Sequence, residues 1–464
     1  MKKRELLNLG IPNGEPVRAA LALIKTLAGE GRTVDTMRDL IKQTVDAPHA
    51  HLGNNLLGPL AHSIVDVPAA PAFVPRAHPA PFTQYGRGLD KNSIAQMRNG
   101  CQLPVAVRGA LMPDAHLGYG LPIGGVLGTD KAVIPYAVGV DIACRMKLTV
   151  LDIPVAALDS QRDRLTTAIE EETRFGIGAA FKKPRQHEVM DADWNISPIT
   201  REKKDKAWSQ LGSSGSGNHF VEFGVFTVDD ASFGIEAGDY LSLLSHSGSR
   251  GTGAAVADHY SKLARGGHPE LPKELQHLSW LDLDSADGAE YWAAMQLMGQ
   301  YAAANHHCIH KHIAAKLGAK VLVDIENHHN FAWEEKHDGR NVIVHRKGAT
   351  PAGVGVLGII PGSMATPAFV VEGKGDPASL ASASHGAGRM MSRKKAKSSL
   401  HWKDAKAILK SQNVTLLSAG IDEVPAVYKN IHDVMAAQTD LVKVRAKFQP
   451  RLVKMAPSGE PPED

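Results

Sequence analysis

Histidines beside glycine, asparagine or serine are the residues of this chain best suited to chemistry. The sequence holds 22 histidines, and histidine is the commonest metal ligand and a frequent nucleophile near neutral pH. Four of them stand in polar segments that adjoin apolar runs: His219 in LGSSGSGNHFVEF, His246 in LLSHSGSRGTG, His329 in VLVDIENHHNFAWEE and His385 in SASHGAGRMMSR. Taken singly, each segment is equally typical of an ordinary turn next to a strand.

Asp141 and Cys144 lie three residues apart in GVDIACRM. If that stretch is turned, the carboxylate and the thiolate can point to one place and hold a divalent metal. A lone buried cysteine near a turn aspartate is the alternative, and alone it is the commoner case. In the segment 211–223, glycines and serines leave backbone N–H groups free to face a phosphate. His219 and Glu222 there should lie on opposite faces of a strand and serve different partners.

His385 is followed by a run of cations that includes Arg389 and Arg393. A histidine nitrogen among small residues can attack phosphorus to form a phosphoramidate, while nearby cations offset the phosphate charge. The alternative is a basic helix start with a solvated histidine. The run ANHHCIHKH (304–312) looks more like a metal cluster. However, it lies in a helical pattern in which His306 and His310 share a face, so a partly exposed helix is expected there.

Apolar spacing predicts the elements that must position these residues. Helices are expected at 16–30, 34–47, 157–175, 253–265, 289–316, 399–411 and 430–438, and strands at 123–127, 146–151, 220–226, 321–325 and 342–344. Because strands and helices do not alternate regularly, the fold class is expected to be α+β. Residues 1–80 form a predicted helical N-terminal extension that ends in an extended Pro/Ala-rich linker (67–82). Residues 81–455 form a single large domain, and residues 456–464 a disordered tail.

The bulk composition is that of a soluble globular protein. The chain has 464 residues, 22% of them charged, and a formal net charge of +3. So small a charge requires any nucleic-acid site to be a local basic groove. Three cysteines without a pairing pattern indicate reduced thiols and a cytoplasmic protein. No signal peptide or membrane-spanning stretch is expected.

The order of these segments and their amino-acid sequences together resemble the signature blocks of RtcB-type RNA-splicing ligases. The matching blocks are residues 111–146, 211–223, 245–253, 327–330, 343–350 (IVHRKGAT), 359–366 (IIPGSMAT) and 384–393. The resemblance runs from about residue 80 to Lys454 and implies one large RtcB-like catalytic domain after the helical extension. It implies an enzyme that uses GTP and two manganese ions and acts on RNA.

The resemblance implies a two-metal centre in which the Cys144 sulfur bridges both ions. The implied ligands are Asp141 and His219 for one metal, and His246 and His329 for the other. Ligand softness alone would favour zinc or iron, whereas the family implies manganese.

The resemblance also implies a nucleotide site around His385, which would carry the guanylate. The implied pocket comprises Asn218, His219, Phe220, Val221, Glu222, His329, Asn330, Pro361, Gly362, Ser363, Met364, His385, Gly386, Ala387, Gly388 and Lys454. Arg250, Arg389 and Arg393 are candidates for holding RNA phosphates. Two positions depart from the family pattern: Arg145 replaces the usual glycine after the bridging cysteine, and Ala368 replaces a serine that contacts the nucleotide in some members.

The implied activity joins RNA 2′,3′-cyclic phosphate or 3′-phosphate ends to 5′-hydroxyl ends, as in tRNA splicing or RNA repair. Two alternatives remain. A metal-dependent phosphoesterase would open cyclic phosphates without joining ends and would not need His385. A non-catalytic RNA-binding relative should have lost ligands, yet all five are present. The sequence leaves open the need for an activating protein partner, the oligomeric state and the RNA that is joined.

Overall fold

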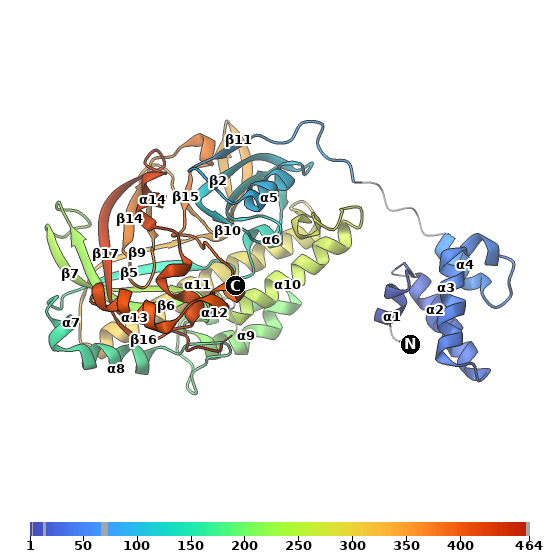
Figure 1. Cartoon of the computed structure of the whole chain (residues 1–464), viewed down its shortest axis with the longest axis horizontal. Helices are drawn as coiled ribbons and strands as arrows, with labels where there is room; N and C mark the ends of the chain where they lie inside the picture. The colour runs from blue at the N-terminus through green and yellow to red at the C-terminus, as the bar shows by residue number, and fades with distance from the viewer. Residues whose placement is uncertain (2, 13–14, 66–72, 461–464) are drawn as a thin grey trace. The chain divides into compact units, whose positions relative to one another are not determined.

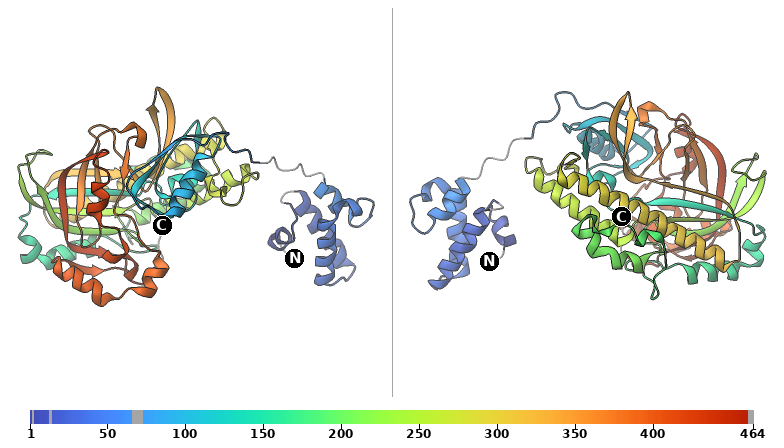
Figure 2. Two further views of the ribbon diagram at one scale, coloured as in Figure 1. Left: turned by 45° about the horizontal axis from the view of Figure 1, so that its top comes forward. Right: turned by 180° about the vertical axis from the view of Figure 1, so that it is seen from behind.

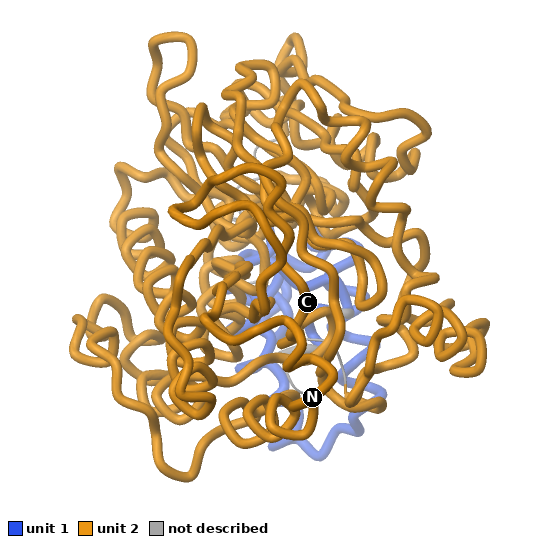
Figure 3. Tube along the Cα trace, turned by 90° about the vertical axis from the view of Figure 1, so that its left-hand side faces the viewer, with its two compact units in different colours: residues 1–72 blue, residues 73–464 orange. Residues whose placement is uncertain are grey.

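The computed structural model describes residues 1, 3–12, 15–65 and 73–460. The chain divides into two compact units, Met1–Ala72 and Phe73–Asp464, which are coloured separately in Figure 3. Each unit has its own apolar core. The expected linker lies partly outside the described residues. From Phe73 onward the chain packs on the second unit, where the Ala80 amide donates to the Cys101 carbonyl (2.8 Å).

The first unit is a small helical module, as the sequence predicts. Its helices are α1 (Lys3–Asn8), α2 (Glu15–Gly29), α3 (Val34–Asp46), the short 3-10 helix η1 (Pro48–His51) and α4 (Gly58–Val65). Thr33 begins α3 because its hydroxyl accepts a hydrogen bond from the Thr36 amide, which satisfies a backbone donor at the helix start. Leu6, Leu27 and Ile41 are fully buried in the core of this unit.

The second unit contains two larger sheets and a set of helices (Figure 1), which confirms the α+β class. One sheet has the order β1-β2-β3-β11-β10; the other has the order β13-β14-β17-β6-β7-β5-β9, with β16 paired to β17. The strands of the first are β1 (Phe82–Gln84), β2 (Ala106–His116), β3 (Ile123–Thr129), β11 (Arg340–Lys347) and β10 (Asn330–His337). Those of the second are β13 (Leu357–Ile360), β14 (Ala368–Gly373), β17 (Val442–Met455), β6 (Phe220–Val228), β7 (Gly238–Ser247), β5 (Arg145–Leu151), β9 (Val321–His328) and β16 (Thr415–Ser418). Two short pairs, β4 (Ala132–Val133) with β8 (Leu281–Asp282) and β12 (Ala349–Pro351) with β15 (Ser382–Ser384), complete the strands.

Helices occur at each position predicted in the second unit, with shifted ends, and further helices, among them those at 91–101 and 198–210, were not predicted. The helices of this unit are α5 (Lys91–Cys101), α6 (Pro135–Val138), α7 (Ala157–Ser160), α8 (Arg162–Glu172), α9 (Pro198–Gln210), α10 (Arg250–Gly267), α11 (Ala286–Lys316), α12 (Arg393–Ser399), α13 (Trp402–Ser411) and α14 (Ile431–Ala436). The segment 157–175 is two helices rather than one, because Gln161 leaves the helical conformation (φ −127°). Among the described residues, no helix is long and apolar enough to cross a bilayer.

The eight-stranded sheet positions the site because its two faces differ. On one face, Val221 and Phe223 pack against residues of α8 and α11; α11 is the long yellow helix in the view from behind in Figure 2. Side chains alternate along a strand, so Phe220 and Glu222 point to the other face, where they line a cavity. The site therefore lies on the sheet face opposite α11.

Candidate active site and metal centre

A cavity of about 750 Å³ brings the predicted segments together. The implied site residues that line it are Asp141, Cys144, Asn218, His219, Phe220, Glu222, His246, His329, Asn330, Pro361, Gly362, Ser363, Met364, His385, Gly386, Ala387, Gly388, Arg389 and Arg393. They come from six segments that are far apart in the chain. A volume of this size is in the ordinary range for a small-molecule site.

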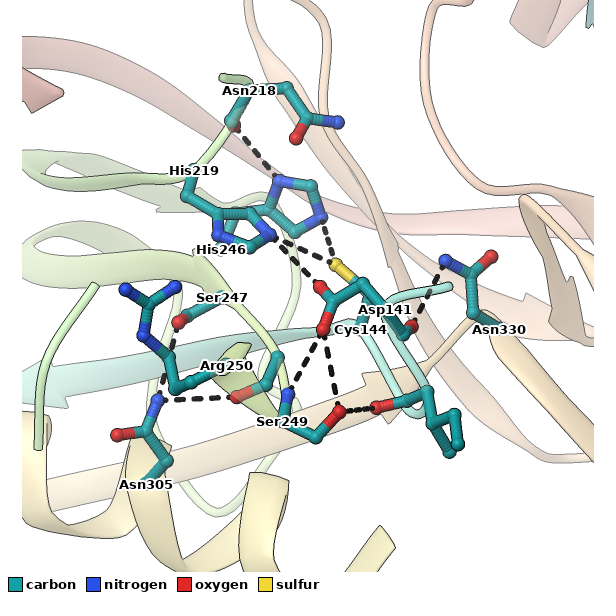
Figure 4. Close-up of polar contacts among 12 residues, drawn as sticks. Asp141, Cys144, Asn218, His219, His246, Ser247, Ser249, Arg250, Asn305 and Asn330 are labelled. Atoms are coloured by element: carbon teal, nitrogen blue, oxygen red, sulfur yellow. Dashed lines mark hydrogen bonds and ion pairs between the residues drawn. The ribbon is translucent and has the colours of Figure 1, made fainter. Parts of the chain in front are cut away.

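Cys144 stands at the centre of the candidate metal site (Figure 4). Its sulfur lies 3.4 Å from His219 Nε2 and 3.1 Å from His246 Nε2. Two triads of ligand atoms share this sulfur: Asp141, Cys144 and His219 form one, and Cys144, His246 and His329 form the other. A ligand common to two triads is what a bridged pair of cations requires.

A tight turn carries Asp141 and Cys144 to the same place. Ala143 between them has φ +58°, a left-handed conformation that costs a residue with a Cβ roughly 1–2 kcal/mol. Hydrogen bonds hold the turn: the Ala143 amide donates to the Asn330 carbonyl (2.6 Å), and the His329 amide donates to the Cys144 carbonyl (3.0 Å). The second bond also fixes His329 next to the sulfur.

The Nε2 atoms of two histidine rings face each other. His246 Nδ1 donates to the Asn218 carbonyl (3.0 Å), so its Nε2 carries the lone pair. That Nε2 lies 3.1 Å from His329 Nε2. Burial lowers the pKa of His246 to about 3 and that of His329 well below its usual value. Neutral imidazoles and a thiol converging in this way fit divalent cations, because a cation resolves the clustering of lone pairs.

Asp141 completes the donor set with a carboxylate. Burial works against its charge, but the hydrogen bond and charge of His219 hold the pKa of Asp141 below its usual value. Its Oδ2 lies 3.1 Å from His219 Nε2, and the Ser249 amide donates to its Oδ1 (3.1 Å). Gly248 is needed here, since a Cβ at that position would lie 2.2 Å from the carboxylate.

His385 is oriented by Asp114, a residue that the sequence reasoning missed. His385 Nδ1 donates to Asp114 Oδ2 (2.7 Å), and the His385 and Gly386 amides donate to the same oxygen. Burial opposes charge on Asp114, but the neighbouring His385 brings the pKa of this fully buried carboxyl below its usual value. With Nδ1 engaged as a donor, the lone pair of the neutral ring is on Nε2. The His385 ring lies 5.0 Å from that of His329, between centroids.

Glu222 and Lys347 are two further buried groups of the cavity wall. Burial raises the pKa of Glu222 well above its usual value. Burial also lowers the pKa of Lys347 to about 7. The Lys347 ammonium donates to the carbonyls of Tyr119 (2.6 Å) and Tyr136 (3.0 Å).

His219 and Glu222 line the same cavity, although opposite strand faces were expected for them. His219 lies one residue before β6, so the alternation along the strand does not apply to it. Their partners do differ: His219 faces Asp141 and Cys144, whereas Glu222 faces other parts of the cavity wall.

Three implied residues do not line the cavity. Val221 and Lys454 are paired in neighbouring strands and point to the face that α8 covers. Lys454 forms an ion pair there with Glu170 (2.7 Å). The side chain of Arg250 is buried and donates to Ser213 Oγ (3.2 Å) and the Gly176 carbonyl (3.1 Å). Strand alternation and burial thus turn these side chains away from the cavity, contrary to the implied assignment.

Arg389 and Arg393 do line the cavity, but acidic residues hold them. Arg389 contacts Glu423 (3.3 Å), and Arg393 contacts both Glu423 and Asp422. Tyr428 also donates to Glu423. Any phosphate bound by these guanidinium groups would share them with carboxylates.

The histidine-rich run 304–312 lies in α11 and is partly exposed, as predicted, since His306 and His310 are buried and His307 is exposed. His306 and His310 both contact Ser245 Oγ, each at 2.7 Å, which confirms that they share a face. His310 also contacts Thr149 (2.7 Å). Cys308 is buried too, and the described cysteines form no disulfide bond.

Comparisons with known proteins identify relatives of this chain. The family model described as tRNA-splicing ligase RtcB matches residues 96–196 and 188–455. The RNA-splicing ligase RtcB of Escherichia coli K12 is 33% identical over 400 residues, which cover 79% of this chain and 95% of the relative. The chain belongs to the RtcB family.

Other RtcB relatives give the same result. The tRNA-splicing ligase RtcB of Nanoarchaeum equitans is 30% identical, over 78% of this chain and 91% of its own length. The RNA-splicing ligase RtcB of Mycobacterium bovis is 32% identical, over 76% and 98%. The family match begins at residue 96, so the helical unit before Phe73 lies outside it.

The two departures from the RtcB pattern have different consequences. Arg145 does not line the cavity; its guanidinium donates to the Gly299 carbonyl (3.3 Å) and contacts His328 (3.2 Å). It therefore serves the contact between β5 and α11. Ala368 does line the cavity, so its wall lacks the hydroxyl that a serine would supply.

Proposed function

We propose that this chain is a GTP- and manganese-dependent RNA ligase that joins 2′,3′-cyclic phosphate or 3′-phosphate ends to 5′-hydroxyl ends. One observation carries the proposal: His385 and the two ligand triads that share Cys144 line a single cavity. Membership of the RtcB family supports the same activity.

Asp141, Cys144, His219, His246 and His329 would hold two cations. When bound, divalent cations offset charge on phosphate oxygens and align the attacking and leaving oxygens. Thiolate and imidazole ligands do not select manganese by themselves, so the choice of metal rests on the family.

His385 supplies the nucleophile. Its Nε2 attacks the α-phosphorus of GTP, an N–P bond forms, and the P–O bond to pyrophosphate breaks. Asp114 keeps the proton on Nδ1 and the ring in place, and offsets the positive charge that the ring gains. The chain thus positions the reacting atoms rather than providing a strong base.

The guanylate then passes to RNA. An oxygen of the RNA 3′-phosphate attacks the same phosphorus, and the N–P bond breaks, which returns the lone pair to His385. A cyclic phosphate must first be opened by water. The 5′-hydroxyl of the second RNA finally attacks the activated 3′-phosphate, loses its proton and displaces GMP.

The base of GTP would be read by the cavity wall beside β6. A carboxylate accepts two hydrogen bonds from the N1–H and N2–H groups of guanine, which adenine cannot donate. Glu222 is the buried carboxyl on this wall, with Phe220 and Asn218 nearby in sequence. Binding of guanine would favour the charged form of Glu222 over the neutral form that burial favours.

An end-joining assay tests the proposal. One RNA ends in a 2′,3′-cyclic phosphate, the other begins with a 5′-hydroxyl, and GTP and Mn²⁺ are added. The expected result is a joined product with the wild type and none with His385→Ala. Opening of the cyclic phosphate without joining would indicate a phosphoesterase, and RNA binding without reaction a non-catalytic protein; either result refutes the ligase.

A further inference from the structure

Large apolar side chains are exposed on the wall of the cavity. Leu117, Tyr119 and Met390 line it with exposed fractions of 56%, 68% and 60%. Isolated exposed apolar residues need no explanation, but several gathered on one cavity indicate a binding surface. None of these three residues takes part in the chemistry proposed for His385 and the metal ligands.

Tyr119 is exposed and yet firmly held. Its ring meets those of Tyr136 and His277 edge-on, with centroids 6.5 and 6.0 Å apart. The ammonium of Lys347 donates to the Tyr119 carbonyl (2.6 Å). The preceding residue, Gly118, exchanges two hydrogen bonds with the Gln96 amide (2.7 and 3.1 Å). The ring therefore loses little conformational entropy when a flat group binds to it.

The charged residues of the same cavity indicate the kind of occupant. Arg389, Arg393 and Lys394 line the same cavity, and the Lys347 ammonium lies 5.1 Å from the centre of the Tyr136 ring. Aromatic rings among cations are how proteins hold unpaired nucleotides: the rings stack on bases and the cations meet phosphates. Glu423 and Asp422 already hold Arg389 and Arg393, so bound phosphates would share these guanidinium groups, whereas an apolar peptide or a lipid chain would bring no charge to the cations.

We propose that Tyr119 is a stacking platform for an unpaired nucleobase at the RNA end that is brought to His385. The inference rests on the proposed function and names the part of the substrate that this side of the cavity recognises. Every base has a flat face, so the contact does not depend on sequence. It requires the terminal base to be unpaired, and it therefore favours single-stranded ends over blunt duplex ends.

Removal of the base and removal of the ring together test the inference. Short single-stranded RNAs are prepared with a 5′-hydroxyl or a 3′-phosphate end, each with a normal or an abasic terminal nucleotide. Their dissociation constants are measured by fluorescence anisotropy with the full chain. For wild type, loss of the base at the recognised end should weaken binding roughly fivefold to 100-fold, the range for one base on one ring.

Tyr119→Ala should bind the normal RNA as weakly as wild type binds the abasic RNA, with no further loss on removal of the base. Tyr119→Phe, which keeps the ring, should retain the wild-type discrimination. Val354→Ala is the matched control, because Val354 is 84% exposed and does not line the cavity; it should behave as wild type. A wild type indifferent to the base at both ends, or Tyr119→Ala discriminating as wild type does, overturns the inference.

The proposed ligase activity is measured separately, by GTP labelling of the wild type without RNA. If the wild type is labelled but binds normal and abasic RNA equally, only the role of Tyr119 is refuted. Discrimination without label refutes the ligase mechanism and leaves the stacking site in place.

Discussion

Two groups of buried histidines in this protein differ in what their ring nitrogens can do. His246 and His329 come from separate segments, and their ligand atoms lie close to each other and to the Cys144 sulfur. His306 and His310 come from one helix. Thr149 donates to Asp324 (3.0 Å), so it accepts from His310 Nδ1, and His310 Nε2 in turn accepts from Ser245. The lone pair of His310 is thereby used.

The comparison shows that the density of histidines in a sequence is a poor guide to a metal site. Burial lowers the pKa values of His246 and His310 alike, so both rings are neutral. The two rings differ in whether their second nitrogen has a hydroxyl group as its hydrogen-bond partner. A backbone carbonyl occupies one nitrogen of His246 and leaves the other for a cation, whereas hydroxyl groups occupy both nitrogens of His310.

The largest expected effect comes from removing the shared sulfur. Cys144→Ala should lower the metal content below that of wild type and reduce end joining by more than about 100-fold, the upper range for losing a group that only supports a ligand. Metal is measured by elemental analysis after dialysis. Cys308→Ala is the matched control, because Cys308 is also buried but lies on α11. Retention of both ions by Cys144→Ala would remove the bridging role.

Asp114→Asn tests the orientation of His385. An amide can no longer offset the charge on the ring, so formation of the guanylate adduct should slow by about 100-fold or more. The rate is measured by quenched labelling with GTP at saturating metal. Metal content should not change, because Asp114 lies in neither ligand triad. Wild-type labelling by Asp114→Asn would show that the carboxylate does not assist His385.

Glu222→Gln tests how the base is recognised. The glutamine amide group donates where guanine also donates, so the preference for GTP over ATP should fall about fivefold to 100-fold, the discrimination typical of one paired contact to a base. Competition of ATP with labelled GTP measures this preference. An unchanged preference would place guanine elsewhere in the cavity.

His310→Gln should act on stability and not on metal. Loss of its hydrogen bonds should lower the free energy of unfolding by about 1–3 kcal/mol, as measured by urea denaturation. An equal loss of bound metal would erase the distinction between the two groups.

The pH dependence of stability in the same variant tests the comparison further. Because burial lowers the pKa of His310 in the folded chain, the unfolded chain binds more protons as pH falls below about 6.5. Above that pH, this histidine does not lower the free energy of unfolding. As pH decreases below it, the free energy of unfolding falls by at most about 1.4 kcal/mol per pH unit for one histidine. Urea denaturation between pH 7 and 5 should show a shallower fall for His310→Gln than for wild type.

The sequence predicts the fold class from local patterns, whereas the members of the candidate metal site follow only from the resemblance of several segments together to the RtcB family. His246 lies near the end of β7, His329 directly follows β9, and α11 is helical throughout, as its spacing indicates. The face of the sheet to which a strand's side chain points is harder to predict. Val221 and Lys454 fall in the right segments but on the wrong face, because the register of β6 against β17 decides which side chains reach the cavity.

Other parts of the site depend on contacts that no local pattern encodes. Asp114 lies 271 positions from His385, and its only signal is a carboxylate within an apolar strand. Arg250 looks like a phosphate ligand beside His246, but it is buried against Gly176 and Ser213. Tyr119 is one aromatic residue in a glycine-rich loop, and only the folded chain places it on the cavity wall.

The central claim is that His385 accepts a guanylate beside two cations in one cavity. It is tested most directly by incubating the protein with α-labelled GTP and Mn²⁺ and locating an acid-labile adduct by peptide mapping. The account predicts label on His385 in the wild type, none on His385→Ala, and a strong reduction with Cys144→Ala. Equal labelling of His385→Ala, or an unlabelled wild type loaded with metal, would contradict it.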